Sequence, residues 1–305
     1  RGVMLWRRDT IALLAWALTT GQCVYVSHST AIQAARSSCR SAVAAPPLHM
    51  NGNPCVIKVV GVGGGGGNAV NRMIQYGQAQ SGAVEYWAVN TDIQALDASL
   101  SPNRLGLGAT TSRGLGAGGS PDLGQAAAEE SYEPICQMVA ESDMVFVVAG
   151  MCALRGGGTG SGAAPIVAEA AKAAGSLTVG VVTKPFSFEG IRRMRQADGA
   201  IKRLQQHVDA MIVVSNDRLL DLVEEGTPLQ EAFCVADDIL RQGVVGISDI
   251  IINPGLINVD FADVQSVMGA SGLALMGIGT AEGKSRARDA AVAAVSSPLI
   301  DFPIA

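Results

Sequence analysis

Two glycine clusters constrain the fold more than any other feature of this sequence. Residues 61–67 and 156–162 consist mainly of glycine, and each cluster follows a short apolar run and precedes a helical stretch. Because glycine has no Cβ, the backbone N–H groups of such a loop can close on an anion. The N-terminus of the following helix adds a partial positive charge. The clusters therefore predict strand–loop–helix units with anion-binding turns.

Apolar runs alternate with helical stretches through the middle of the chain. The expected strands are residues 56–60, 84–89, 144–149, 177–182 and 211–214, and the expected helices are residues 68–75, 123–141, 163–174 and 192–206. This alternation is typical of βαβ units, so we expect an α/β fold with a Rossmann-like parallel sheet. Further helices are expected over residues 228–245, 261–268 and 286–295.

A third glycine-rich stretch, residues 114–119, lies between the two clusters. Three glycine loops at strand ends would together wrap a polyphosphate. Gly61, Gly63 and Gly66 also satisfy G-x-G-x-x-G, which leaves an NAD-type site open. The sequence has no G-x-x-x-x-G-K-[ST] motif, and neither strand-following cluster contains lysine. Backbone amides, helix ends and a metal ion would therefore meet the phosphate charge.

Composition excludes several other classes of protein. The net charge of −5 argues against a nucleic-acid binder, which usually has a basic surface. No apolar run reaches the roughly 18 residues that a membrane-spanning helix needs. The six cysteines show neither C-x-x-C nor a metal-ligand spacing with the three histidines, so we expect free thiols and no protein-held metal.

Residues 56–298 resemble the tubulin/FtsZ family. The stretches that carry the resemblance are IKVVGVGGGGGNAVNRMI, WAVNTD, RGLGAGG, GGGTGSGAAP, VVTKPFSFEG, SNDRLL, NVDFADV and SSPL, in the family's order. The segments EEGTPLQEAF, VADDILRQGV, GISDII and GKSRAR are similar to the cyanobacterial and chloroplast branch of FtsZ. The resemblance implies a GTPase domain followed by a long central helix and a second, C-terminal domain.

The resemblance also implies that the ligand is GTP or GDP, with Mg²⁺ held through the phosphates. Glu189 and Arg193 match ribose and phosphate contacts, although an i,i+4 pair alone would indicate a surface salt bridge. Asn216 matches a further family position. The residues that match the glycine-loop contacts are Gly64, Gly65, Gly66, Gly67, Asn68, Gly116, Ala117, Gly118, Gly157, Gly158, Thr159, Gly160 and Ser161.

Two residues of the long helix match the family's purine-binding groups. Asp238 corresponds to the aspartate that reads guanine, whose N1–H and N2–H groups can both donate to a carboxylate. Phe233 corresponds to the aromatic ring that stacks on the base. Without the resemblance, Asp238 would be interpreted as a solvated helix charge.

The segment from Asn258 to Asp263 is expected to carry the chemistry. Asp260 and Asp263 are three residues apart, so on a helix both carboxylates face one way and could orient a water for attack on the γ-phosphate. The resemblance implies that this loop enters the nucleotide pocket of the next subunit, which gives head-to-tail filaments and links hydrolysis to assembly. The common alternative for D-x-x-D is an N-capping pair.

The sequence departs from the family pattern at three places. Residues 78–81 lengthen a loop, and residues 152–155 form an insertion at the mouth of the second glycine cluster, which we expect to displace its glycines. The chain ends at Ala305, so we expect the second domain and the tail that docks membrane-tethering partners to be largely missing. We therefore expect a chain that binds GTP, hydrolyses it slowly alone and caps filaments of full-length subunits.

The N-terminal region has the composition of a targeting segment. Arg7 and Arg8 precede an apolar run at residues 11–18, and residues 27–50 contain Ser and Arg but no Asp or Glu. These features indicate a secretory signal followed by a transit segment, and hence import into a plastid. The expected division is a disordered targeting segment at 1–54, a GTP-binding domain at 55–226, the central helix and catalytic loop at 227–270, and the start of the second domain at 271–305.

The leading hypothesis is a self-assembling GTPase of plastid division that works with itself, other FtsZ-type subunits and division proteins. It predicts no nucleic-acid partner and no membrane span. The alternatives are an assembly-incompetent GTP-binding regulator of such filaments and an NAD(P) oxidoreductase. The oxidoreductase would lack a catalytic His or Tyr–Lys set and would leave the second glycine cluster unexplained.

Overall fold

The structure is a computed structural model of the 305-residue chain. It describes residues 2–7, 12–17, 22–27, 55–76, 84–151, 157–220, 229–252, 260–269, 271–279, 281–283 and 285–295. The expected insertion at 152–155 and the lengthened loop at 78–81 lie outside these residues.

An eight-stranded sheet in the order β1-β10-β9-β8-β7-β4-β5-β6 forms the centre of the molecule. The strands are β1 (Gly2–Arg7), β2 (Ala12–Ala17), β3 (Gln22–Ser27), β4 (Ile57–Val62), β5 (Val84–Asn90), β6 (Asn103–Gly106), β7 (Met144–Gly150), β8 (Leu177–Lys184), β9 (Ala210–Ser215) and β10 (Gly272–Gly279). From β10 to β6 all neighbours pair in parallel. The predicted α/β fold with a parallel sheet is confirmed.

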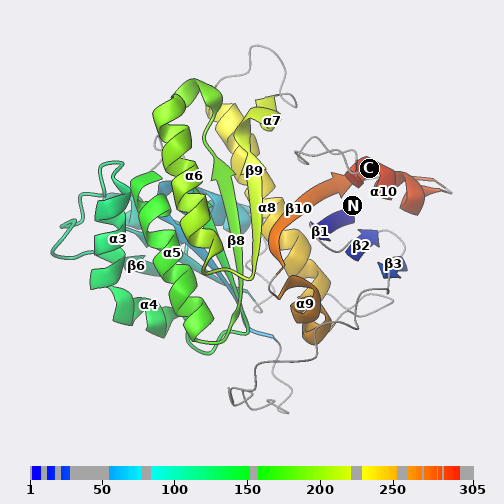
Figure 1. The fold of residues 1–305 in the computed structure, drawn as a ribbon, viewed down its shortest axis with the longest axis horizontal. Coiled ribbons are helices and arrows are strands. Elements are labelled where there is room, and N and C mark those ends of the chain that lie inside the picture. The colour runs from blue at the N-terminus through cyan, green and yellow to red at the C-terminus, as the bar shows by residue number, and fades with distance from the viewer. Residues whose placement is uncertain are drawn as a thin grey trace, which may run out of the picture.

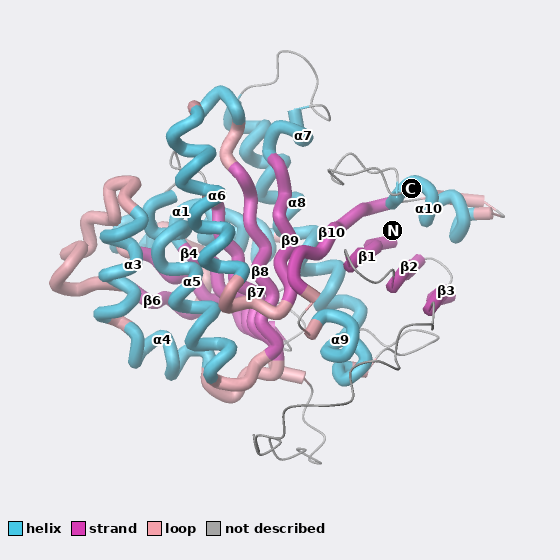
Figure 2. The backbone as a smooth tube through the Cα atoms, in the orientation of Figure 1, coloured by secondary structure: helices cyan, strands magenta, loops and turns pink. Residues whose placement is uncertain are grey.

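Helices cover both faces of this sheet (Figure 1). They are α1 (Gly63–Gln75), α2 (Ile93–Asp97), α3 (Pro121–Glu130), α4 (Tyr132–Val139), α5 (Gly157–Ala173), α6 (Ile191–Gln205), α7 (Asn216–Leu220), α8 (Leu229–Ile252), α9 (Phe261–Met268) and α10 (Arg286–Val295), with a 3₁₀ turn at Ser187–Glu189. Buried residues of α3, α4, α5 and α6 form one core, and those of α1, α8 and α9 form the other. Figure 2 shows the strands between helices. Because both faces are covered, β4 and β7 are buried along their whole length.

The helix boundaries differ from the expected ones in an informative way. The helix expected over 123–141 is two helices, α3 and α4, which meet at Ser131. Pro134 explains the break, because its ring has no N–H to donate to the carbonyl of residue 130 and would clash with it. Both glycine-led helices begin inside their clusters, at Gly63 and Gly157, so the glycines themselves form the first turns.

The N-terminal region contains three strands where we expected no ordered structure. β1 pairs antiparallel with β10, from Gly2 opposite Gly279 to Arg7 opposite Ala274, and β2 pairs with β3 in a separate sheet. β10 itself pairs with β9 and so extends the sheet of the preceding domain. The expected boundary at residue 271 therefore falls within one continuous sheet.

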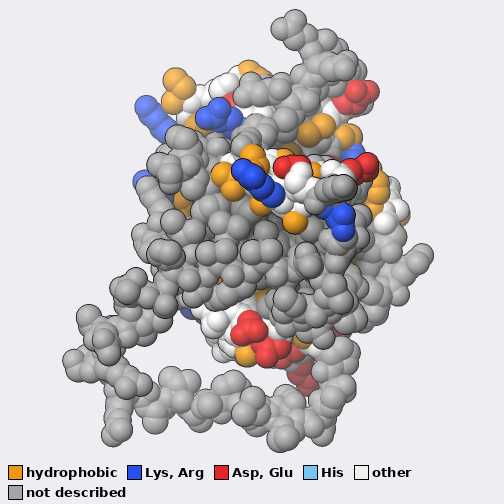
Figure 3. Space-filling view, turned by 90° about the vertical axis from the view of Figure 1, so that its right-hand side faces the viewer, with side chains coloured by type: hydrophobic (Ala, Val, Ile, Leu, Met, Phe, Trp, Pro, Cys, Tyr) orange, Lys and Arg blue, Asp and Glu red, His pale blue; other side chains and the backbone are white. Residues whose placement is uncertain are grey.

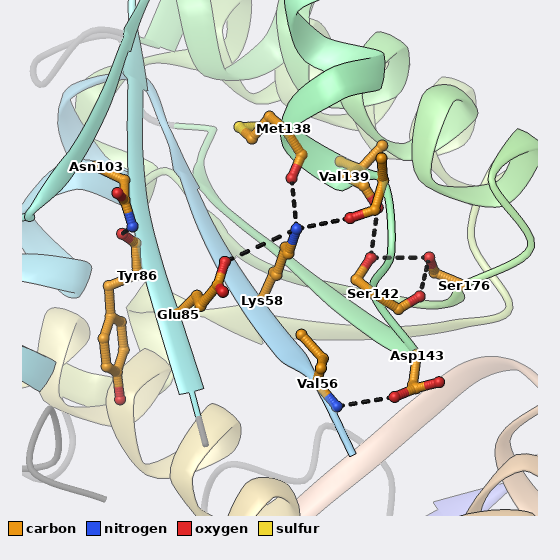
Figure 4. A network of polar contacts seen from close by, with 11 residues as sticks. Val56, Lys58, Glu85, Tyr86, Asn103, Met138, Val139, Ser142, Asp143 and Ser176 are labelled. Carbon is orange, nitrogen blue, oxygen red and sulfur yellow. Dashed lines mark hydrogen bonds and ion pairs between the residues drawn. The ribbon is translucent and has the colours of Figure 1, made fainter. Parts of the chain in front are cut away.

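A buried lysine fixes α4 against the amino end of the sheet (Figure 4). Lys58 of β4 is 7% exposed, and its Nζ donates to the carbonyl oxygens of Met138 at 3.0 Å and Ala140 at 2.7 Å. Glu85 lies 3.8 Å away and is half-exposed. These carbonyls end α4 and have no partners within the helix, so the ammonium group satisfies them and complements the helix dipole.

Asp143 fixes the segment that leads into β4 at the same end of the sheet. Its Oδ2 accepts a hydrogen bond from the N–H of Val56 at 2.8 Å, and its own N–H donates to the Val56 carbonyl at 3.0 Å. Burial, together with Asp143, raises the pKa of the neighbouring Cys55 thiol to about 12. The thiol is therefore protonated at neutral pH and poorly reactive.

Candidate functional site

The strand order reverses between β4 and β7, at the centre of the sheet. From β4 the chain proceeds to β5 and β6 on one side, and from β7 it proceeds to β8 and β9 on the other. The helices that follow these two strands, α1 and α5, contribute to the cores on opposite faces. In open parallel sheets, ligands bind in the crevice outside the carboxyl ends of the strands at such a point.

The first turns of α1 and α5 approach each other around the end of β7. A Cβ on Gly65 would lie 3.0 Å from the Cα of Gly150, and a Cβ on Gly160 would lie 2.9 Å from the Gly150 carbonyl oxygen. A Cβ on Gly66 would lie 2.2 Å from the carbonyl oxygen of Val148. These glycines are therefore required by close backbone packing.

Gly67 is different, because a Cβ at this position would have no atom within 4 Å. Gly67 lines a pocket of about 40 Å³ together with Asn68, Asn71, Asn90 and Ser99. Packing does not explain this glycine, so its backbone is available for the close approach of a ligand.

The third glycine stretch lies against the same crevice. The N–H of Gly116 donates to the carbonyl of Thr91 at 3.1 Å, and the hydroxyl groups of Thr91 and Thr159 are 2.6 Å apart. A Cβ on Gly158 would lie 2.7 Å from the carbonyl carbon of Gly119. The three glycine stretches therefore lie together. In the third stretch Ala117 is buried, and Gly118 has a φ of 56°, which suits glycine.

The electrostatics of the crevice favour an anion. Neither α1 nor α5 has an acidic residue in its first turn, and no side chain caps the N-terminus of α1. The N–H groups of these turns carry the positive ends of two helix dipoles. The arrangement can therefore bind phosphate groups through backbone amides.

Glu189 and Arg193 form an ion pair beside this crevice. Arg193 Nη1 lies 3.4 Å from Glu189 Oε2, and the Glu189 side chain is fully buried while that of Arg193 is 37% exposed. The pair is therefore no ordinary surface salt bridge. Gln196 connects α6 to the third glycine stretch, because its Nε2 donates to the Gly119 carbonyl at 3.1 Å.

Asn216 begins α7 at the carboxyl end of β9, and only 2% of its surface is exposed. Its Oδ1 has no hydrogen-bond partner among the residues that the structure describes. A buried amide oxygen without a donor is costly, so a ligand group that donates to it would be bound favourably.

The acidic pair of α8 divides into two different environments. Asp238 accepts hydrogen bonds from Arg241 and Gln242 of its own helix; burial alone would raise its pKa, but these contacts outweigh burial and lower it. Asp237 is 6% exposed and faces α1, where Arg72 lies 3.7 Å away. Sequence reasoning passed over Asp237, because only the packing of α8 against α1 distinguishes the two carboxylates. The side chain of Phe233 lies outside the described residues.

Asp260 and Asp263 lie at the opposite end of the sheet. They lie at the start of α9, which leads into β10. The first residue of β10 aligns with Ala210, the first residue of β9, so β10 begins at the amino edge of the sheet. Asp260 caps α9, because its Oδ1 accepts from the N–H of Asp263 at 2.8 Å, so the N-capping interpretation holds for this residue. Both residues are exposed, and acidic side chains gather at this lower end of the molecule (Figure 3). Asn258 lies outside the described residues.

The crevice and the acidic loop therefore cannot meet within one molecule. They occupy the carboxyl and amino edges of the same parallel sheet. Within the described residues no group of His, Cys, Asp and Glu could hold a metal ion. Within the same residues, no helix has both the length and the apolarity needed to cross a bilayer.

Comparisons with known proteins agree with this geometry. The GTPase domain of the Tubulin/FtsZ family matches residues 56–224. An empty FtsZ dimer from M. jannaschii is 44% identical, with a TM-score of 0.76 over 82% of this chain and 70% of that chain. A GTPgS-bound protofilament of CetZ2 from Haloferax volcanii is 26% identical, with a TM-score of 0.65 over 77% of this chain and 69% of that chain. The chain therefore belongs to the tubulin/FtsZ family, whose GTPase domain it contains.

Proposed function

We propose that this chain is a GTP-binding, self-assembling cytoskeletal GTPase of the FtsZ type that acts in plastid division. The observation that carries the proposal is the meeting of two glycine-led helix N-termini, α1 and α5, where the strand order reverses. Such a crevice suits a nucleoside triphosphate better than a single phosphate, because three loops contribute backbone amides. Family membership and the second glycine helix argue against the NAD(P)-dependent alternative.

Hydrolysis is proposed to occur between two subunits. The acidic loop at the amino edge of one molecule would meet the crevice at the carboxyl edge of the next, which is a heterologous contact that propagates into filaments. The FtsZ dimer and the CetZ2 protofilament to which this chain is similar support such self-association. Division proteins that anchor the filament would be further partners.

Mg²⁺ is proposed to enter the site with the phosphates. The ion would be held mainly by phosphate oxygens and water, which are hard oxygen ligands of the kind that Mg²⁺ prefers. The ion would neutralise charge on the β- and γ-phosphates. This chain's own part is to bind the phosphates through the first turns of α1 and α5 and to orient the attacking water through Asp263 of the neighbouring subunit.

Asp238 is proposed to read guanine. Each of its carboxylate oxygens accepts one hydrogen bond within α8 and keeps a second lone pair, and the side chain is partly exposed. We expect Asp238→Asn to reduce the preference for GTP over ATP by about 100-fold or more, because an amide cannot accept from both guanine donors. Competition binding with labelled GDP measures this preference.

The matched control is Asp237→Asn, which changes the neighbouring carboxylate that faces Arg72. Both variants should keep the native far-UV circular dichroism spectrum. Full GTP preference in Asp238→Asn, together with its loss in Asp237→Asn, would show that Asp237 is the base-reading residue and that the assignment of Asp238 is wrong.

Import into a plastid is proposed from the composition of the N-terminal region. Its apolar run at residues 11–18 and its acid-poor stretch at residues 27–50 suit a signal followed by a transit segment. We expect residues 1–50 fused to a fluorescent protein to direct fluorescence into plastids of an algal cell. A fusion of residues 55–305 is the control and should stay in the cytosol. Cytosolic fluorescence from the first fusion would contradict the proposal.

A further inference from the structure

We propose that Arg241 and Tyr76 position the carboxylate of Asp238 for guanine and so help to set the preference of this chain for GTP over ATP. Arg241 would act directly on the carboxylate, and Tyr76 would act through Arg241. Both are positioning residues, because neither is expected to touch the nucleotide. The inference rests on the proposed function, since it requires that Asp238 reads the base.

The Asp238 carboxylate is held by two donors of its own helix. Arg241 Nε donates to Oδ1 at 2.7 Å, and Gln242 Nε2 donates to Oδ2 at 2.5 Å. Burial raises the pKa of Asp238, but the hydrogen bond from Arg241, followed by that from Gln242, outweighs burial and lowers the pKa. The carboxylate is therefore ionised at neutral pH, as an acceptor of two guanine N–H groups must be. Because the donors also restrict its rotation, less conformational freedom is lost when the base binds.

The guanidinium group of Arg241 is in turn held by an aromatic ring. Its Cζ lies 4.7 Å from the centre of the Tyr76 ring, within the range of a cation–π contact. The planar guanidinium group can stack with its face and donate with its edge at the same time. Arg241 therefore connects the ring of Tyr76, at the C-terminus of α1, to the Asp238 carboxylate on α8.

Helix α1 connects this arrangement to the crevice. Asn68, Arg72 and Tyr76 follow one another at intervals of four residues, so they lie along one side of α1 and its C-cap. Asn68 lines the pocket at the crevice. Arg72 lies 3.7 Å from Asp237, the residue before Asp238 on α8. A nucleotide whose phosphates occupy the first turn of α1 could therefore extend its base along this side of the helix toward Asp238.

A pair of Asp and Arg three residues apart on a helix is usually a solvated contact of little consequence. The Arg241 side chain differs, because only 14% of it is exposed. The adjacent carboxylate of Asp237 has a cation of its own in Arg72, so the donors of Arg241 serve Asp238. A contact that only stabilised α8 would affect the binding of guanine and adenine nucleotides alike. A positioning contact would change the ratio of the two affinities.

The experiment measures competition of GDP and ADP with labelled GDP for the full chain, so that hydrolysis plays no part. Arg241→Met keeps an unbranched apolar stem but removes the donors and the charge, and should lower the preference for GDP over ADP by about tenfold. Tyr76→Leu removes the ring and should lower this preference by about two- to fivefold. Tyr76→Phe is the matched control, because it keeps the cation–π contact and should keep the full preference. Tyr76 is 61% exposed, so its variants should keep the native circular dichroism spectrum.

The same substitutions made together with Asp238→Asn are the decisive arm, because positioning residues act only through that carboxylate. We expect Arg241→Met and Tyr76→Leu to cause no further loss of preference in this background. Full preference in Arg241→Met, an equal loss of GDP and ADP affinity, an equal loss of preference in Tyr76→Phe and Tyr76→Leu, or a further loss in the Asp238→Asn background would overturn the positioning role alone. Full preference in Asp238→Asn by itself would overturn the base-reading role as well, and with it this part of the proposed function.

Discussion

Alanine at Gly66 is expected to destabilise the fold severely, whereas alanine at the next residue, Gly67, is expected to leave it intact. The new Cβ at Gly66 would lie 2.2 Å from the carbonyl oxygen of Val148 in the central strand β7 and 3.0 Å from the backbone of Gly61. Neither backbone can move without disturbing the sheet, so the cost is about 3 kcal/mol or more. That is a large fraction of a typical domain stability of about 5–15 kcal/mol.

Gly67→Ala is the matched control, because its Cβ would meet no atom within 4 Å. Replacing glycine within a helix should stabilise α1 by about 0.5–1 kcal/mol. The same methyl group would stand where a phosphate approaches, so we expect GTP to bind at least tenfold more weakly. Thermal unfolding should show a midpoint lowered by roughly 6–12 °C in Gly66→Ala and unchanged or raised in Gly67→Ala. Equal melting of both variants would contradict this account of the cluster.

This contrast within one cluster also shows what the sequence could and could not predict. The run of glycines after an apolar strand was sufficient to predict the turn from a buried strand into a helix. It could not distinguish Gly66, which contacts β7, from Gly67, which faces open space. That difference depends on β7, a strand about 80 residues further along the chain.

The long buried strands could be predicted, because continuous apolar runs are typical of strands that are covered on both faces. β6 and β10 were missed for different reasons. β6 has only four residues and alternates in burial at the edge of the sheet. β10 begins and ends with glycine, which disfavours a strand by itself. Its edge is covered by β1, a pairing across more than 260 residues that no local pattern indicates.

The acidic pair of α8 illustrates the same limit at the site. Two adjacent aspartates have the same local sequence signal, yet Asp237 faces Arg72 of α1 and Asp238 bonds along its own helix. Helical spacing fixes the angle between such side chains but not which of them faces a neighbouring helix. The capping role of Asp260, in contrast, could be considered from sequence, because D-x-x-D is itself a capping pattern.

Asp263→Asn is expected to reduce GTP turnover by about 100-fold to 10,000-fold, the usual contribution of a positioned general base. Asp263 is exposed at the start of α9, while Asp260 is occupied in capping the helix. The substitution removes the charge of the side chain but keeps the backbone N–H of residue 263, which donates to the Asp260 carboxylate, so the fold should be unchanged. GTP affinity should also be unchanged, because the crevice of the same molecule is intact.

Asp260→Asn is the control for the loop itself. Asparagine caps helices about as well as aspartate, so stability should stay within about 0.5 kcal/mol. A smaller loss of turnover than in Asp263→Asn is expected, since the cap positions Asp263. If Asp263→Asn hydrolysed GTP at the normal rate while Asp260→Asn did not, the roles of the two carboxylates would be reversed.

In the proposed active site, the crevice of one subunit meets the acidic loop of another. Gly67→Asp should block the crevice, because its carboxylate would occupy the open space beside this position and repel phosphate groups. This variant keeps its acidic loop, and Asp263→Asn keeps its crevice. Neither variant alone should turn over GTP above background at concentrations where the unchanged chain is active.

The measurement is GTP turnover by an equal mixture of Gly67→Asp and Asp263→Asn. If the site is shared, random head-to-tail contacts pair an intact crevice with an intact loop in roughly a quarter of cases, so about a quarter of the normal rate should return. The recovered rate should also rise with total protein concentration. A mixture that hydrolyses no more GTP than the sum of its separate components would contradict the account.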